Sequence, residues 1–126
     1  MSEPLILVAD DDEDILLLVT TRLRRDGFDV VSASNGDEAL ALAREHKPAL
    51  AVLDIGMPGL DGLEVLAAIR ADETLRGTLV LLLTAKAQES DVRRGYDSGA
   101  DAYVKKPFSP AELSVRVRGL LEPAPS

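Results

Sequence analysis

The 126-residue chain has the length of one ordinary domain, and its 46% hydrophobic and 29% charged residues are typical of a soluble globular protein. Its formal net charge of −8 argues against direct nucleic-acid binding, which needs a basic face, and the absence of cysteine excludes disulfides, Cys-zinc sites and thiol catalysis. The longest apolar run, Leu79–Leu83, is five residues, so neither a membrane span nor a secretion signal is expected. These features predict a cytoplasmic domain that contacts neither membrane nor nucleic acid.

Short apolar runs alternate with amphipathic segments along the chain. The apolar runs predict five strands, at Leu5–Ala9, Phe28–Ala33, Leu50–Asp54, Leu79–Thr84 and Ala102–Lys105. Helical spacing of apolar residues predicts helices over Asp12–Asp26, Asn35–His46, Leu63–Ile69, Ser90–Ser98 and from Pro110 to Leu120. Buried strands that alternate with helices predict an α/β fold, in which helices cover both faces of a five-stranded parallel sheet.

The Asn35-Gly36 pair is compatible with two local structures, a hairpin turn or the cap of a helix. The residues that follow have a helical period, in Ala39, Leu40 and Ala43, and acidic side chains stand three residues after Ser34 and Asn35. We therefore expect a capped helix at this position.

Polar side chains follow four of the predicted strands. Asp54 ends an apolar run directly before a Gly/Pro-rich loop, and a carboxylate there is costly unless a metal, a cation or a proton compensates it. In open parallel sheets the carboxyl ends of the strands border the active crevice. The residues at those ends are Asp10, Asp11, Asp54, Thr84 and Lys106. Acids, a hydroxyl and a lysine gathered at one edge suggest phosphoryl chemistry on Asp54.

The acidic run from Asp10 to Asp14 divides into two parts. Acids favour the start of a helix, so the later members, from Asp12 on, are interpreted as a solvated helix start. An EF-hand is excluded, because Ile15 occupies the position of the required glycine and Thr21 that of the closing glutamate. Asp10 and Asp11 leave the strand directly and should converge with Asp54. Three carboxylates repel one another without a cation, and Mg²⁺ held by a few carboxylates plus water fits them best.

Each remaining candidate has a plainer interpretation as well. Thr84 alone is compatible with an ordinary β-branched strand end, and Lys106 with a surface lysine. Near Asp54 both become donors to phosphoryl oxygens. Tyr103 is either a half-buried aromatic residue or a ring whose position reports on the site. His46, the single histidine, is expected on the surface.

The chain resembles the receiver domain of bacterial two-component response regulators from about residue 4 to residue 121. The motifs that carry the resemblance are Ile6–Asp11, Val52–Asp54 together with Met57–Gly62, Leu83–Ala85, Gly99–Tyr103 and Lys106–Phe108. Each motif alone is weak, but five motifs in order at the family's intervals are highly specific. The resemblance implies a flavodoxin-like, doubly wound (βα)5 fold with strand order 2-1-3-4-5.

The resemblance also implies a role for each site residue. Asp54 would be the phosphoacceptor for a sensor histidine kinase or phosphotransfer protein. Asp11 and Asp54, together with the backbone carbonyl of Gly56, would bind Mg²⁺ directly, and Asp10 would bind it through water. Lys106 would pair with Asp54 and then with the phosphoryl group.

The family further implies a conformational switch. Thr84 would hydrogen-bond a phosphoryl oxygen and Tyr103 would be the switch aromatic, while the Lys106–Pro107 peptide bond would be cis. Signalling to an output domain or protein would use the face formed by the helix at 90–98, the strand at 102–105 and the last helix.

The residues present match only part of the charge pattern of one known dimer of the family on that face. Receivers of winged-helix transcription factors pair there through charged residues, and Glu112 and Arg116 match them. Val92 and Ala102 stand where those relatives carry a base and an acid. A weak homodimer remains an expectation.

Two rival functions are weighed against the receiver. A haloacid-dehalogenase-type phosphohydrolase would need a second Asp two residues after the nucleophile, but Gly56 stands there and no cap segment is evident. A pseudo-receiver that no longer takes phosphate would not need the acid pair, Asp54, Thr84 and Lys106. We expect the receiver domain to span residues 1–122, with residues 123–126 a Pro-rich tail or the start of a linker, and we expect it to act as a signalling domain rather than an enzyme in the usual sense.

Overall fold

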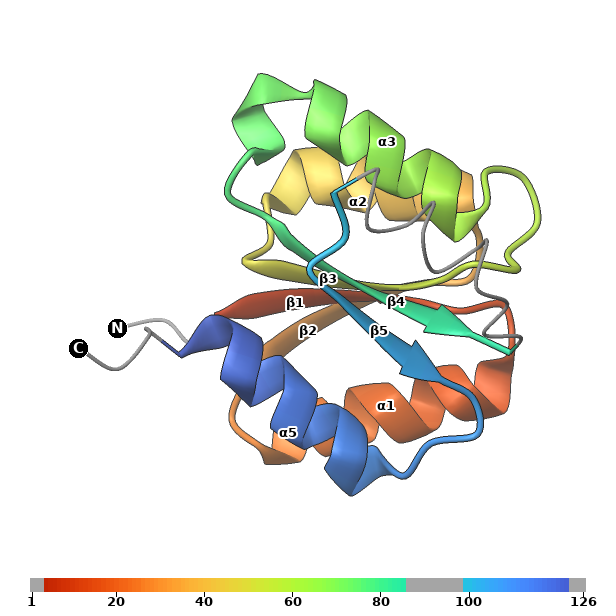
Figure 1. The fold of residues 1–126 in the computed structure, drawn as a ribbon, viewed down its shortest axis with the longest axis vertical. Coiled ribbons are helices and arrows are strands. Elements are labelled where there is room, and N and C mark those ends of the chain that lie inside the picture. Colours follow the sequence, from red (N-terminus) through yellow and green to blue (C-terminus); the bar gives the residue numbers. More distant parts are fainter. Residues whose placement is uncertain (1–3, 86–98, 123–126) are drawn as a thin grey trace.

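The computed structural model describes residues 4–85 and 99–122. Strands and helices alternate along these residues (Figure 1). The strands are β1 (Leu5–Ala9), β2 (Asp29–Ala33), β3 (Leu50–Asp54), β4 (Leu79–Thr84) and β5 (Ala102–Lys105). The helices are α1 (Glu13–Arg25), α2 (Gly36–His46), α3 (Gly62–Ala71), α5 (Pro110–Leu121) and the 3-10 turn η1 (Glu73–Leu75). The helix predicted at Ser90–Ser98 lies outside the described residues.

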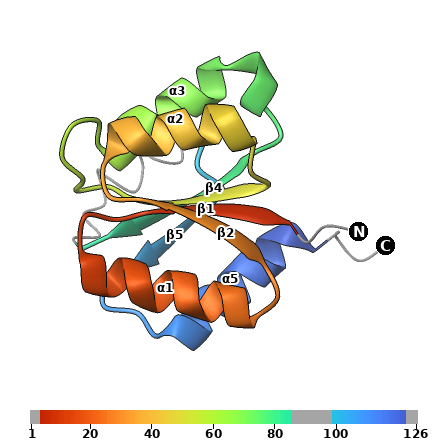
Figure 2. The same ribbon diagram turned by 180° about the vertical axis from the view of Figure 1, so that it is seen from behind.

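All strand pairs of the sheet are parallel, and the order is β2-β1-β3-β4-β5. Helices α2 and α3 cover one face of the sheet, and α1 and α5 cover the other (Figures 1 and 2). The predicted α/β class, parallel sheet and strand order are confirmed. Because every strand points the same way, the strands end at one common edge, which we call the carboxyl rim, and begin at the opposite edge, the amino rim.

Two apolar clusters fill the space between the sheet and its helices. One lies toward α2 and α3 and includes Leu53, Leu66 and Ile69; the other lies toward α1 and α5 and includes Leu83 and Val117. The central strand β3 is buried along its whole length, as expected for a strand covered on both faces. The apolar spacing seen in the sequence therefore marks the faces that pack.

Capping side chains define where the helices begin. Asp12 caps α1 by accepting hydrogen bonds from the backbone N–H groups of Asp14 and Ile15. Asn35 caps α2 in the same way, which confirms the capped helix and excludes the hairpin. The predicted bounds are right to within one or two residues, but Leu18, which shares the helical spacing of the apolar residues of α1, is 47% exposed.

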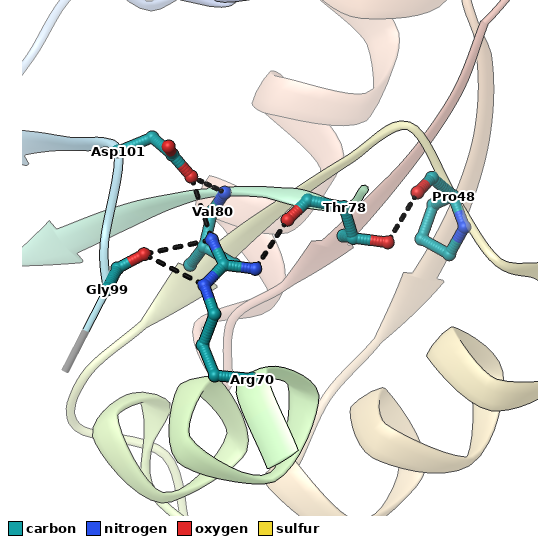
Figure 3. Close-up of polar contacts among 6 residues, drawn as sticks. All are labelled: Pro48, Arg70, Thr78, Val80, Gly99 and Asp101. Carbon is teal, nitrogen blue, oxygen red and sulfur yellow. Dashed lines mark hydrogen bonds and ion pairs between the residues drawn. The ribbon is translucent and has the colours of Figure 1, made fainter. Parts of the chain in front are cut away.

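A charged cluster on the amino rim joins α3 to the two strands at that side of the sheet (Figure 3). The Arg70 guanidinium donates to the carbonyl oxygens of Gly99 at 2.9 and 3.0 Å and of Thr78 at 2.7 Å, and to Oδ2 of Asp101 at 2.9 Å. The same Asp101 oxygen accepts the backbone N–H of Val80 at 2.8 Å. These long-range bonds hold the start of β4, the start of β5 and the end of α3 together.

Two surface expectations can be compared with the fold. His46 is exposed at the end of α2, as predicted. Within residues 4–85 and 99–122, no helix has both the length and the apolar character that crossing a membrane requires.

Candidate functional site

The carboxyl rim brings the predicted site residues together around one hollow of about 610 Å³. Asp10 directly follows β1, Asp54 and Thr84 are the last residues of β3 and β4, and Lys106 directly follows β5. The residues that line the hollow are Asp11, Asp12, Asp54, Ile55, Gly56, Thr84, Ala85 and Lys106. Asp10 does not line the hollow, but it is fully buried and contacts Lys106, which does.

Lys106 bridges the two buried carboxylates. Its Nζ lies 3.0 Å from Oδ2 of Asp10 and 3.4 Å from Oδ1 of Asp54. Backbone donors complete the arrangement, because the N–H of Gly56 donates to Asp54 Oδ1 at 3.3 Å and the N–H of Asp12 donates to Asp10 Oδ1 at 2.9 Å. The backbone just after each strand therefore turns back to hold the carboxylate at that strand's end.

The electrostatics of the site leave Asp54 uncompensated. Burial, followed by the negative charge of Asp10, raises the pKa of Asp54 to about 6, and the opposing effects of Lys106 and the Gly56 N–H are too small to reverse this. Burial alone would lower the pKa of Lys106, but its contacts with Asp10 and Asp54 outweigh burial and raise it. One ammonium thus lies between two carboxylates, and the pKa of Asp54 stays raised beside it.

The donor set fits a small divalent cation. Asp10, Asp11 and Asp54 each offer a carboxylate oxygen, and these oxygens lie within 4.8 Å of one another. Among the described residues, Oδ2 of Asp10 is buried and contacts the Lys106 ammonium at 3.0 Å, with no further hydrogen bond. Hard oxygen ligands that are few and partly hydrated match the demands of Mg²⁺.

The two candidate switch residues lie on neighbouring strands near this site. Thr84 is 5% exposed and lines the hollow. Tyr103 is 9% exposed and packs in the apolar cluster toward α2 and α3, so its ring is more buried than the half-buried aromatic residue expected from the sequence. The Lys106–Pro107 peptide bond is cis, as the resemblance predicts.

Sequence reasoning missed two groups that support the site. Asp12 was interpreted only as a solvated helix start, yet it lines the hollow and its backbone N–H holds Asp10. Gly62 opens α3 directly against β3, and a Cβ atom there would lie 2.6 Å from the backbone oxygen of Asp54. A glycine at the first position of a helix, where it contributes nothing to helix stability, was the available signal.

Comparison with known proteins identifies relatives over nearly the whole chain. Residues 6–118 match the response regulator receiver domain family. The alkaline phosphatase synthesis transcriptional regulatory protein PhoP of Bacillus subtilis is 47% identical over 92% of this chain, and the DNA-binding response regulator MtrA of Mycolicibacterium smegmatis is 45% identical over 92%. Those matches cover 48% and 50% of the two relatives, so the chain spans about half their length.

Solved structures give the same result for the fold. The chemotaxis response regulator CheY4 of Vibrio cholerae superposes with a TM-score of 0.90 at 29% identity, covering 95% of this chain and all of the other. The BeF3-activated DrrB receiver domain superposes with a TM-score of 0.86 at 36% identity, covering 96% of this chain and 99% of the other. The flavodoxin-like sheet, the acidic carboxyl rim and these matches lead to one conclusion: the chain belongs to the receiver domain family of two-component response regulators.

Proposed function

We propose that Asp54 accepts a phosphoryl group, in a Mg²⁺-dependent reaction, from a sensor histidine kinase or a phosphotransfer protein. The observation that carries this proposal is the convergence on the carboxyl rim, among the described residues, of three carboxylates and one lysine, whose ammonium contacts two of those carboxylates. Such an arrangement is unfavourable by itself and becomes favourable when positive charge and a phosphoryl group are added.

The residues of this chain have distinct tasks in the transfer. An oxygen of Asp54 forms the new bond to phosphorus, while the bond from phosphorus to the donor nitrogen, or to the oxygen of an acyl phosphate, breaks and its electron pair leaves with the donor. Lys106, already 3.4 Å from Asp54 Oδ1, stabilises the negative charge on the transferring oxygens. Thr84, at the edge of the hollow, donates its hydroxyl to one of those oxygens.

The metal would be held by Asp11, Asp54 and the backbone carbonyl of Gly56, with Asp10 acting through water. When bound, Mg²⁺ supplies positive charge to phosphoryl oxygens and so favours the in-line transfer. Asp10 keeps Lys106 in place from below, since its carboxylate lies 3.0 Å from the ammonium.

Phosphorylation would then act as a switch between two packings. The product holds up to two negative charges and three acceptor oxygens beside Thr84, where the Asp54 carboxylate held one charge, and a preference of a few kcal/mol is enough to shift a two-state equilibrium. We place Tyr103 in that switch and the readout on the face of β5 and α5, where a hollow is lined by residues including Tyr103, Glu112 and Arg116. The third element of this face, the helix predicted at 90–98 with its Val92, lies outside the described residues.

The partners and the cellular setting follow from this role. We propose a kinase or phosphotransfer protein as donor and an output domain or protein as receiver of the signal, in the cytoplasm, without direct contact of this domain to nucleic acid or membrane. A weak homodimer is proposed as well. The domain assists its own phosphorylation and dephosphorylation but turns over no separate substrate.

The first test is the intact mass of the protein after incubation with acetyl phosphate and Mg²⁺. One phosphoryl adduct is expected in the wild type, and none with EDTA or in the Asp54→Asn variant. An adduct that persists in Asp54→Asn would contradict the assignment of the acceptor. A folded wild-type protein that accepts no phosphoryl group from acetyl phosphate, phosphorylated kinases or phosphotransfer proteins would favour the phosphate-independent module.

A further inference from the structure

The loop between β3 and α3, residues 55–61, carries the Gly56 carbonyl that we assign to the metal. Its first residue is held by the sheet, because the N–H of Ile55 donates to the Leu83 carbonyl at 3.0 Å, and its two ends are joined by the N–H of Gly62, which donates to the Ile55 carbonyl at 3.1 Å. Met57 is 4% exposed and inserts into the apolar cluster toward α2 and α3. The outer part of the loop, residues 58–60, needs a separate support.

That support is the first turn of α2. The Cα atom of Gly36 lies so close to the loop that a Cβ atom would stand 1.7 Å from the Leu60 carbonyl oxygen, 2.5 Å from the Leu60 carbonyl carbon and 2.7 Å from the Leu60 Cβ. The Gly36 N–H points to the Pro58 carbonyl oxygen at 3.4 Å. Because the nearest atoms are backbone, no side-chain rotation could make room for a larger residue.

Asp37, the next residue of α2, also contacts this loop. The carboxylate of Asp37 lies over Gly59, against the position where a Cβ atom of Gly59 would stand. Two consecutive residues of α2 therefore touch two consecutive residues of the loop. The cap at Asn35, whose side chain accepts the Glu38 N–H at 2.8 Å, fixes the direction from which this turn approaches.

We infer that Gly36 is a positioning residue for the metal site: its missing side chain lets α2 support the 58–60 segment and so sets the place of the Gly56 carbonyl beside Asp54. Even one methyl group at residue 36 requires α2 and the Leu60 backbone to move apart by more than 1 Å, because Cβ contacts below 3.0 Å essentially never occur. Displacements of this size at groups that align a reaction cost about 100-fold in rate. The inference rests on the proposed function of Asp54 and the metal.

The test compares Gly36→Ala with Gly77→Ala, a loop glycine at which a Cβ atom meets nothing within 4 Å. Mg²⁺ affinity of the unphosphorylated protein is measured by calorimetric titration, and adduct formation by intact mass at saturating Mg²⁺. We expect Gly36→Ala to weaken Mg²⁺ binding at least tenfold and to slow adduct formation at least tenfold, and Gly77→Ala to change neither. A folded Gly36→Ala variant with wild-type Mg²⁺ affinity and rate would overturn the inference, even if its unfolding midpoint were lower.

A second pair of variants keeps the test decisive if Gly36→Ala does not fold. Leu60→Ala removes the loop side chain that packs partly buried against the cluster toward α2, and Leu42→Ala removes a leucine of similar burial from the same cluster in the middle of α2. We expect only Leu60→Ala to weaken Mg²⁺ binding, by three- to tenfold. Equal Mg²⁺ affinities in the two variants would overturn the inference. Failure of the proposed function is a separate result, because the wild type itself would then neither bind Mg²⁺ nor form the adduct.

Discussion

Asp54 on the carboxyl rim and Asp26 at the opposite end of α1 have equally buried side chains, each 8% exposed, yet their pKa values move in opposite directions. Burial alone would raise both. At Asp26 a hydrogen bond from the Ser114 hydroxyl and the charges of Arg22 and Arg118 more than offset burial, so its pKa is lowered. At Asp54 the charge of Asp10 adds to burial, and the pKa rises to about 6.

The partners therefore account for much of the difference, alongside the position of the residues, because Asp54 is buried as a whole residue and Asp26 only partly. Asp26 has enough positive charge and hydrogen bonds to join α1 to α5, and the Arg70–Asp101 cluster similarly joins α3 to β4 and β5 (Figure 3). Among the described residues of the carboxyl rim, three carboxylates gather around one lysine. Balanced clusters hold the fold together, while the unbalanced one is the cluster for which we propose uptake of a cation and a phosphoryl group.

The largest expected effect comes from removing the positive charge of the carboxyl rim. Lys106→Met should slow adduct formation from acetyl phosphate about 100-fold or more, because the charge on the transferring oxygens loses its nearest ammonium. The time course of intact mass at saturating Mg²⁺ measures this rate. Lys105→Met, at the exposed neighbouring residue, is the matched control. A Lys106→Met rate within threefold of the wild type would remove Lys106 from the transfer.

A substitution in the charged cluster of the amino rim should lower the stability of the protein and leave its phosphorylation unchanged. Arg70→Met removes four hydrogen bonds and leaves the carbonyls of Gly99 and Thr78 without this donor, so the free energy of unfolding should fall by about 2 to 4 kcal/mol. Urea unfolding measures the loss. Arg76→Met, at an exposed arginine 3.9 Å from Glu73, should change it by less than about 0.5 kcal/mol. Loss of phosphorylation in folded Arg70→Met protein would contradict the division between the rims.

Asp26 should stabilise the protein above its pKa and lose this effect in acid. Since its folded pKa is lowered below the unfolded value of 3.8, its contribution is complete above 3.8 and is lost as the pH falls through the folded pKa. Asp26→Asn should therefore lower the free energy of unfolding by about 1 to 2 kcal/mol at pH 7. Unfolding in urea at several pH values should show this deficit shrinking below pH 3.8. A deficit that stays constant in acid would show that the charge of Asp26 is not what joins the helices.

Ionised Asp54, unlike ionised Asp26, should destabilise the folded protein. Its folded pKa of about 6 exceeds the unfolded value of 3.8, so its ionisation costs stability fully above about pH 6 and not at all below 3.8. Asp54→Asn should raise the free energy of unfolding by about 1 kcal/mol at pH 7.5 without Mg²⁺, a value reduced by the solvent at the open hollow.

The gain from Asp54→Asn should disappear as the pH falls from 6 toward 3.8, and it should shrink when Mg²⁺ binds the folded wild type. Urea unfolding of both proteins in parallel, with and without Mg²⁺, measures this. A destabilised Asp54→Asn variant at pH 7.5 in metal-free buffer would show that Asp54 is as well compensated as Asp26, and would break the comparison between them.

Much of the fold was predictable because local pattern and burial agree. The apolar run Leu50–Asp54 and the spacing of Leu63, Leu66 and Ile69 mark elements that are buried where expected. The start of β2 differs by one residue, since Phe28 bonds to the end of α1 through the Leu23 carbonyl instead of pairing in the sheet. The residue at which a strand begins depends on contacts between elements, and the spacing of apolar residues along the sequence does not reveal those contacts.

The site was predictable in its members but not in its internal contacts. Residues that follow parallel strands must meet at one rim, so Asp10, Asp54 and Lys106 could be grouped from their positions alone. That Lys106 contacts Asp10 more closely than Asp54, and that Asp10 is fully buried, could not be foreseen. The extent of the domain and the roles of the individual site residues stay predictions.

The sequence by itself determined the strand and helix pattern, the parallel sheet, the rim at which the polar residues gather and the family, because each depends on local spacing or on motifs in order. Only the tertiary structure decided that Gly36 supports the Leu60 segment, that Arg70 reaches Gly99, and that Asp26 is compensated whereas Asp54 is not. These are contacts between residues far apart in the chain. Their energies depend on distance and burial, which exist only once the elements have packed.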